Sequence, residues 1–175
     1  MLTPMHQHLP LTPHWLAPEH VQAPAPVMDW LLDIGSLTQR LKRHGAFSVE
    51  PQEEWRGMAP LSDYGLLELP PEEALVRDVI LALDGEPVVL ARSVMPQSVL
   101  EGENAMLGQM ADRSLGLELF QTPKAIREQL WLTQLAPTNP LGPLWGRQSR
   151  FNKRGGRLLV AEYFLPALWQ RLKVN

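Results

Sequence analysis

The stretch ALVRDVILALDGEPVVLARSVMP (74–96) decides the fold class of this chain. Two runs of mostly apolar and β-branched residues, 74–83 and 87–96, flank the turn sequence DGE. Asp-Gly between two such runs is a strong hairpin signal, because a tight two-residue turn requires positive φ at both central positions. The stretch therefore predicts two antiparallel strands joined by a short turn.

A second hairpin is predicted near the C-terminus, where the runs 144–152 and 157–165 flank the turn sequence RGG. The segment 46–58 is expected to form a further strand, and its Pro51 marks an edge strand or a bulge. The pattern of 124–135 fits a helix or a strand. Strands that come in hairpins predict a largely antiparallel sheet.

The first helix is predicted within 27–44, where apolar residues recur at spacings of three and four. Gly35-Ser36 is expected to kink or split this helix, and Gly45 is expected to end it. A second helix can lie within 99–110, with the sequence SLG (114–116) as the turn that follows it.

The Pro- and Glu-rich segment 59–73 is expected to be a loop, and the tail after Pro166 a short helix. Hairpins are thus accompanied by a few helices, and strands do not alternate regularly with helices. This order predicts an α+β fold, a single domain in which helices lie on one side of an antiparallel sheet.

Composition and charge exclude several classes of function. The 175 residues carry a formal net charge of -3, which argues against general nucleic-acid binding. The sequence has no cysteine, which excludes disulfides and thiol nucleophiles. No apolar run approaches the ~20 residues needed to cross a bilayer, and no secretory signal is visible. We expect a cytoplasmic monomer with no nucleic-acid partner, built from a Pro-rich arm (1–26) and a folded domain (27–175).

Two charged residues occupy strand positions where apolar residues are expected. Arg77 alternates with Leu75 and Val79, and Glu162 follows Val160 at the same spacing. An isolated charge is costly to bury, so each side chain needs a partner or a polar cavity. One interpretation is a buried Arg77–Glu162 ion pair. The other is a ligand cavity in which Arg77 binds a carboxylate and Glu162 accepts a hydrogen bond or acts as a base.

Other arginines can reach the same cavity. The chain has 12 Arg and 4 Lys, and Arg is the residue that binds planar carboxylates through two parallel hydrogen bonds. Arg92 lies among apolar residues of its strand. Arg147 and Arg150 fall on opposite faces of theirs, so at most one of them can face the cavity.

Standard catalytic motifs are missing from the sequence, which has no nucleophile elbow, phosphate loop, dinucleotide loop or zinc-binding helix motif. Beyond the arm the only histidine is His44. An enzyme built from this chain is therefore expected to need no metal and no cofactor. Arg, Glu and backbone groups in a closed apolar pocket suit a unimolecular reaction of an anionic substrate.

Five segments resemble the bacterial chorismate pyruvate-lyases, in order along roughly 28–166. They are DWLLDIGSLTQRL (29–41), VRDVILALDGEPVVLARSVMP (76–96), SLGLELF (114–120), LWGRQSRF (144–151) and LLVAEYFLP (158–166). The resemblance implies an α+β domain with an internal ligand cavity closed by helical flaps. It also implies the conversion of chorismate to 4-hydroxybenzoate and pyruvate, the first step towards the ubiquinone ring.

The resemblance assigns roles to four residues. The family's carboxylate-binding Arg falls on Arg77 and its Glu near the substrate hydroxyl falls on Glu162, while backbone contacts from the flaps fall on Leu37 and Leu115. The second carboxylate of chorismate needs another cation, and Arg92 or Arg147 could supply it.

A non-catalytic domain that binds a small aromatic carboxylate is the alternative function. The same fold serves as the effector-sensing domain of some bacterial transcription regulators, in which a DNA-binding winged helix precedes it. Here only 26 Pro-rich residues precede the first predicted helix, which favours the lyase.

Overall fold

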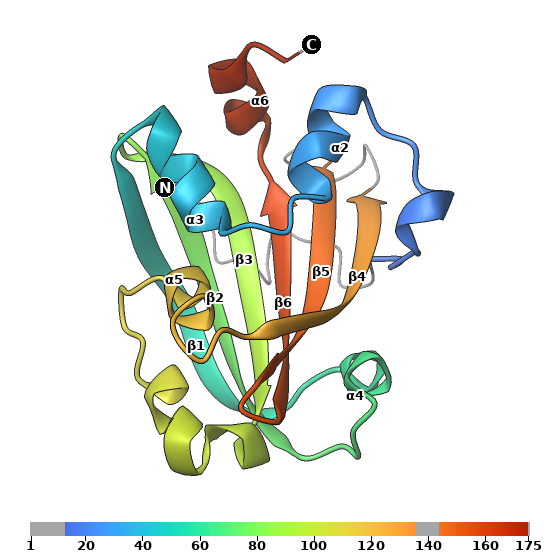
Figure 1. Ribbon diagram of the computed structural model, residues 1–175, viewed down its shortest axis with the longest axis vertical. Helices are drawn as coiled ribbons and strands as arrows, with labels where there is room; N and C mark the ends of the chain where they lie inside the picture. The colour runs from blue at the N-terminus through green and yellow to red at the C-terminus, as the bar shows by residue number, and fades with distance from the viewer. Residues whose placement is uncertain (1–12, 136–143, 175) are drawn as a thin grey trace.

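The computed structural model describes residues 13–135 and 144–174, which form a six-stranded sheet in the order β1-β2-β3-β6-β5-β4. Every neighbouring pair is antiparallel. The strands are β1 (Phe47–Met58), β2 (Glu73–Leu83), β3 (Glu86–Pro96), β4 (Ile126–Leu135), β5 (Leu144–Lys153) and β6 (Gly156–Phe164). The arrangement confirms the predicted α+β class, and the ambiguous segment 124–135 contributes strand β4 (Figure 1).

Both predicted hairpins are present. The β2–β3 turn holds Asp84 and Gly85 at φ of 51° and 80°, and the β5–β6 turn holds Arg154 and Gly155 at φ of 50° and 83°. A tight hairpin turn requires this left-handed conformation, which glycine adopts without strain. The register of β1 against β2 shifts after Pro51, so this proline marks both an edge strand and a bulge, as predicted.

The helices are short and connect or cover the strands. They are α2 (Ala25–Leu31), α3 (Leu37–Leu41), α4 (Leu61–Leu67), α5 (Leu115–Leu119) and α6 (Pro166–Leu172), with 3-10 segments η1 (Pro18–His20), η2 (Lys42–His44), η3 (Gln97–Leu100) and η4 (Gly102–Gly108). The first predicted helix is split at Gly35-Ser36. The helix predicted after Pro166 is α6.

Three local predictions were wrong. The segment 59–73 contains α4, because Tyr64 and Leu67 bury one face of a short helix in an otherwise polar stretch. The sequence SLG (114–116) begins α5 and is not a turn, because the Ser114 hydroxyl accepts a hydrogen bond from the Leu117 N–H at 3.1 Å and so caps the helix. The segment 99–110 forms 3-10 turns and no α-helix.

Helices lie against both faces of the sheet. α2, α3 and α5 cover the face seen in Figure 1, which we call the front face. α4 packs on the back face, where its Tyr64 and Leu67 join a core cluster with Val76 and Leu159. The predicted placement of helices on one side therefore describes α2, α3 and α5, with α4 as the exception.

Residues 13–26 follow the free edge of β4. Leu16 and Leu132 exchange two backbone hydrogen bonds, at 2.8 and 2.9 Å. Trp15 packs against Tyr163, with ring centroids 5.9 Å apart. No helix within 13–135 and 144–174 is long and apolar enough to span a bilayer.

Candidate functional site

A cavity lies between the front face of the sheet and two helical segments that cover it. We call residues 32–41, which include α3, the first flap, and residues 111–120, which include α5, the second flap. The lining is mostly apolar, with hydroxyls from Thr38, Ser93 and Ser114. Five charged residues line it as well, and they are Arg77, Arg92, Arg127, Arg147 and Glu162. The guanidinium group of Arg92 is bound to Asp78, so the other four are the candidates for ligand contacts.

Arg77 of β2 is buried, with 5% of its surface exposed. Its Nη2 donates to the carbonyls of Ala111 at 2.8 Å and Arg113 at 3.0 Å, at the start of the second flap. Burial lowers the pKa of Arg77, against a smaller opposing effect of Glu54. Arg77 thus lines the cavity, and its Nη2 holds the start of the second flap.

Glu162 pairs with Arg147 and not with Arg77. Arg147 Nε donates to Glu162 Oε1 at 2.8 Å, and the two residues face each other across β5 and β6. The Arg147 side chain is 1% exposed and that of Glu162 is 11% exposed. The ion-pair interpretation of Arg77 and Glu162 is therefore wrong in its choice of partners. Arg150, on the other face of β5, bonds Glu128, so Arg147 is the one that reaches the cavity.

Arg92 is not available for a second carboxylate. Of the two candidates that the sequence offered for this role, Arg92 and Arg147, the first was therefore wrong. Its side chain points to the back face and binds both oxygens of Asp78, at 2.7 and 2.8 Å. A regular hairpin that closed at Leu83 and Glu86 would place Arg92 opposite Arg77. The register shifts by one residue between Leu81 and Ala82, and a one-residue slip reverses the face of each later side chain.

Arg127 of β4 is a cavity residue that the sequence did not reveal. Its Nε donates to Ser149 Oγ at 3.0 Å, and its guanidinium lies 4.9 Å from the ring centroid of Phe151. Burial, followed by the charge of Arg147, lowers the pKa of Arg127 to about 10. A bulge between Arg127 and Gln129 interrupts the strand alternation, so no simple face pattern places this side chain in the cavity.

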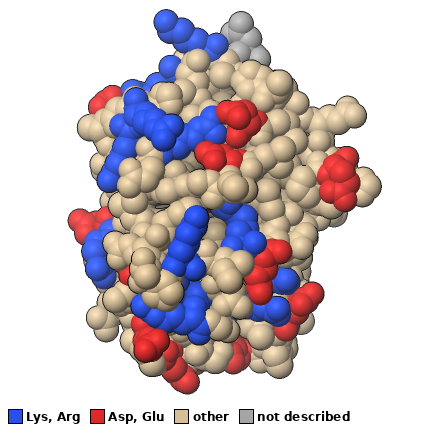
Figure 2. All heavy atoms as spheres, in the orientation of Figure 1, with Lys and Arg blue, Asp and Glu red and all other residues tan. Residues whose placement is uncertain are grey.

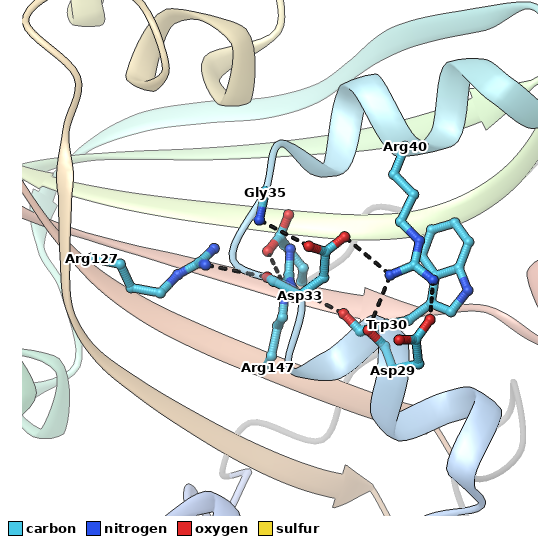
Figure 3. Close-up of polar contacts among 8 residues, drawn as sticks. Asp29, Trp30, Asp33, Gly35, Arg40, Arg127 and Arg147 are labelled. Atoms are coloured by element: carbon cyan, nitrogen blue, oxygen red, sulfur yellow. Dashed lines mark hydrogen bonds and ion pairs between the residues drawn. The ribbon is translucent and has the colours of Figure 1, made fainter.

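The first flap connects to the cavity arginines through one backbone carbonyl. The Asp33 carbonyl accepts hydrogen bonds from Arg147 Nη1 at 3.0 Å and from Arg127 Nη1 at 3.2 Å. Arg147 Nη1 also donates to the Trp30 carbonyl at 3.1 Å. Figure 3 shows these two guanidinium groups approaching Asp33 from the sheet side.

The carboxylate of Asp33 holds the same loop from the outside. It accepts from Gly35 N–H at 2.9 Å and from Arg40 Nη1 at 3.0 Å, and Arg40 stacks 3.9 Å from the Trp30 ring centroid (Figure 3). Burial raises the pKa of Asp33, but hydrogen bonds from Gly35 and Arg40 outweigh it and the net pKa is lowered. The first flap is therefore fixed by an ionised carboxylate and by a carbonyl that accepts hydrogen bonds from two cavity arginines.

Leu37 and Leu115 both lie where the flap contacts were predicted. Each is buried, lines the cavity and is the first residue of its helix, after the capping serines Ser36 and Ser114. The N–H groups of a first helical turn lack the usual acceptor four residues earlier. The serine caps accept from Gln39 and Leu117, and the N–H groups of Leu37 and Leu115 lie at the cavity end of each turn. The two flaps thus present helix starts to the same cavity.

The cavity is electrostatically suited to an anion with more than one carboxylate. Two buried arginines, Arg77 and Arg147, and the half-buried Arg127 line it, and the carboxylate of Glu162 opposes them, which leaves a positive balance in a setting where electrostatic interactions are strong. Lys and Arg side chains are also spread over the flap-bearing surface, interleaved with acidic ones (Figure 2). Within residues 13–135 and 144–174, no three His, Asp or Glu side chains gather in a way that could hold a metal ion.

Fold and cavity together define a class of protein, the α+β domain in which two helical flaps cover a cavity on one face of an antiparallel sheet. Solved structures share this fold. The effector domain of PhnF from Mycobacterium smegmatis aligns with a TM-score of 0.56 and 15% identity, over 78% of this chain and 91% of that one. The ligand-binding domain of a GntR-family regulator from Bordetella bronchiseptica aligns with a TM-score of 0.54 and 19% identity, over 70% and 86%.

Sequence comparison then identifies the family. The chorismate lyase family model matches residues 9–174. A "Probable chorismate pyruvate-lyase" from Alcanivorax borkumensis is 51% identical over 162 residues, which is 91% of this chain and 79% of its relative. A "Probable chorismate pyruvate-lyase 2" from Pseudomonas entomophila is 46% identical, over 85% of this chain and 84% of its relative. The chain belongs to the chorismate lyase family, as the resemblance of its motifs indicated.

Proposed function

We propose that this chain converts chorismate to 4-hydroxybenzoate and pyruvate inside the closed cavity. One observation carries the proposal: in a member of the chorismate lyase family, two buried arginines, a half-buried third and one carboxylate line a cavity that two flaps cover. Chorismate has two carboxylates and one ring hydroxyl, and this set of side chains complements them. The reaction is a step in making the ubiquinone ring, as family membership suggests.

The reaction is an elimination within one molecule. The bond between ring C3 and the enolpyruvyl oxygen breaks, its electron pair leaves with that oxygen, and C4 loses its hydrogen as a proton. The ring becomes aromatic, and the leaving enolpyruvate gains a proton to become pyruvate. Atoms and charges balance without an external reductant, oxidant or water, so holding the substrate in the reactive geometry is the main task of the protein.

Arg77 is proposed to bind the ring carboxylate, with backbone N–H groups of Leu37 and Leu115 completing its surroundings. Arg127 and Arg147 are the candidates for the enolpyruvyl carboxylate, since Arg92 is committed to Asp78 on the back face. Glu162 is proposed to accept a hydrogen bond from the C4 hydroxyl, where it is also placed to move a proton.

Incubation of the purified chain with chorismate tests the proposal directly. The expected products are 4-hydroxybenzoate, followed by its absorbance, and an equal amount of pyruvate, followed by a coupled dehydrogenase. Arg77→Ala is the matched control for contaminating activity. Tight binding of 4-hydroxybenzoate without either product would instead favour the binding-domain alternative, and neither binding nor product would reject both.

A further inference from the structure

The two flaps meet at a hydrogen bond between Thr38 and Ser114. Thr38 Oγ1 in α3 and Ser114 Oγ at the start of α5 lie 2.7 Å apart, although 76 residues separate them in the chain. Thr38 is 2% exposed, and both residues line the cavity. A Cβ added at Gly116 would lie 3.1 Å from Thr38 Oγ1, so glycine at this position allows the close approach of the flaps.

Buried cations of β5 anchor each flap away from this meeting point. Arg147 donates to the carbonyls of Trp30 and Asp33, beside the start of the first flap. Lys153, 1% exposed, donates from Nζ to the carbonyls of Glu118 and Gln121 at the end of the second flap, both at 3.0 Å. The electrostatic anchors therefore hold the flaps to the sheet, and a neutral bond holds them to each other.

Bonds from charged donors are roughly twice as strong as neutral ones. The contact between Thr38 and Ser114 is a single neutral hydroxyl–hydroxyl bond, whereas each anchor is a buried cation with two acceptors. The flaps will therefore separate from each other before they detach from the sheet. Opening at this point exposes the cavity next to Leu37 and Leu115, which both line it.

We propose that the Thr38–Ser114 hydrogen bond is a latch that sets how fast ligands enter and leave the cavity. The identity of the ligand rests on the proposed function, but the latch itself does not. Losing the bond increases the open fraction of the free and of the occupied protein alike. Association and dissociation rates then rise together, and the Kd stays nearly constant. A hydroxyl that bound the ligand would act differently, because its loss would raise the dissociation rate alone and weaken the Kd.

Thr38→Val is the central variant, because valine keeps the branched shape of threonine and leaves the Ser114 cap of α5 in place. Amide hydrogen exchange of the free, full-length protein is the first readout and needs no ligand. We expect α5, in the flap that carries no substitution, to exchange about 2- to 10-fold faster, which is the effect of losing one neutral hydrogen bond. Unchanged exchange of α5 in folded Thr38→Val overturns the latch.

Two control variants separate the latch from general loosening. Thr38→Ser keeps the hydroxyl, so α5 should exchange at the wild-type rate. Ser36→Ala removes the cap of α3, whose hydroxyl accepts from Gln39 N–H at 3.2 Å, and so weakens the first flap without touching the latch. Its α5 should also keep the wild-type exchange rate. If amide exchange of α5 were as fast in Ser36→Ala as in Thr38→Val, any loosening of the first flap would also loosen the second flap. That result would contradict a specific latch.

Stopped-flow binding of 4-hydroxybenzoate, followed by tryptophan fluorescence, is the second readout. Thr38→Val should raise both rate constants by the same factor as the exchange rate. A higher dissociation rate with an unchanged association rate would make Thr38 a ligand contact and overturn the latch. If the wild-type protein neither turns over chorismate nor binds 4-hydroxybenzoate, the proposed function fails, while hydrogen exchange still decides the latch.

Discussion

Replacing Glu162 with glutamine tests the ion pair inside the cavity. Glu162 Oε1 accepts from Arg147 Nε at 2.8 Å, and the Arg147 side chain is 1% exposed. Glutamine keeps the shape and one acceptor oxygen but removes the charge that balances Arg147. A fully stranded buried charge costs about 3–5 kcal/mol. Because the carbonyls of Trp30 and Asp33 still accept from Arg147, we expect a loss of about 1–3 kcal/mol.

For a chain of this length, that loss lowers the Tm by roughly 2–12 °C, at about 2–4 °C per kcal/mol. Turnover of chorismate should fall by more than the affinity for 4-hydroxybenzoate, because a carboxylate at the C4 hydroxyl matters most while the ring loses its proton. Calorimetry and the 4-hydroxybenzoate absorbance assay measure the two effects.

The double variant Glu162→Gln/Arg147→Met is the matched control for Glu162→Gln. The double variant lacks Arg147, the buried cation that Glu162→Gln alone leaves without its carboxylate. Its loss of stability should therefore be smaller than the sum of the losses in the two single variants. Strictly additive losses would show that the two side chains are not coupled. A Glu162→Gln protein with wild-type Tm and wild-type turnover would refute the role of Glu162 in both the fold and the reaction.

Three further variants address the remaining charges. Arg77→Ala should weaken 4-hydroxybenzoate binding by about 10- to 100-fold, the effect of losing a charge-assisted hydrogen bond, and unchanged affinity by calorimetry in the folded variant would contradict its role. Arg127→Met should raise the KM for chorismate more than the Kd for 4-hydroxybenzoate, which lacks the enolpyruvyl carboxylate; equal effects would place Arg127 at the ring carboxylate. Burial raises the pKa of Asp63 to about 6, above the ordinary value of 3.8, against a smaller effect of Arg92. The folded state therefore holds a proton that the unfolded chain releases, and stability should fall by up to about 3 kcal/mol as pH rises from 4 to 6. Asp63→Asn should flatten that part of the Tm–pH profile, and an unchanged slope would mean that another group titrates there.

Strand alternation predicted the charged residues of the site wherever the strands are regular. Arg77 and Glu162 lie on the front face, as their spacing indicated, and Arg147 is the one residue of the pair Arg147 and Arg150 that joins them. Arg92, a candidate for the second carboxylate, has its side chain on the back face, and Arg127 was missed. Both residues lie on strands whose register shifts by one residue, after Leu81 in the first hairpin and after Arg127 in β4. A bulge has no firm signature in a single sequence, and it reverses every face assignment beyond it.

The flap helices were predicted unequally. α3 is the second half of the helix that was expected to split at Gly35-Ser36, whereas α5 was taken for a turn, because its five residues are too few to show the periodicity that reveals a longer helix. The serine caps Ser36 and Ser114 were the available signal, and each precedes a Leu that faces the cavity. The partners of Arg77 and Glu162 could not be predicted either. Arg77 bonds backbone carbonyls of a flap, and Glu162 bonds the side chain of Arg147, and only the folded structure brings these groups together.

The shared Asp33 carbonyl makes ligand binding an exchange of partners. Nη1 of Arg127 and Nη1 of Arg147 already donate to this oxygen. A carboxylate that takes over those N–H groups replaces a backbone dipole with a full charge, and its affinity reflects only the difference between the two contacts. The displaced carbonyl belongs to the first flap, and the carboxylate of the same residue bonds Gly35 N–H and Arg40 Nη1. We therefore expect occupancy of the cavity to change the surroundings of Arg40, whose side chain is 20% exposed. A label near Arg40 would report, from outside, whether the cavity is filled.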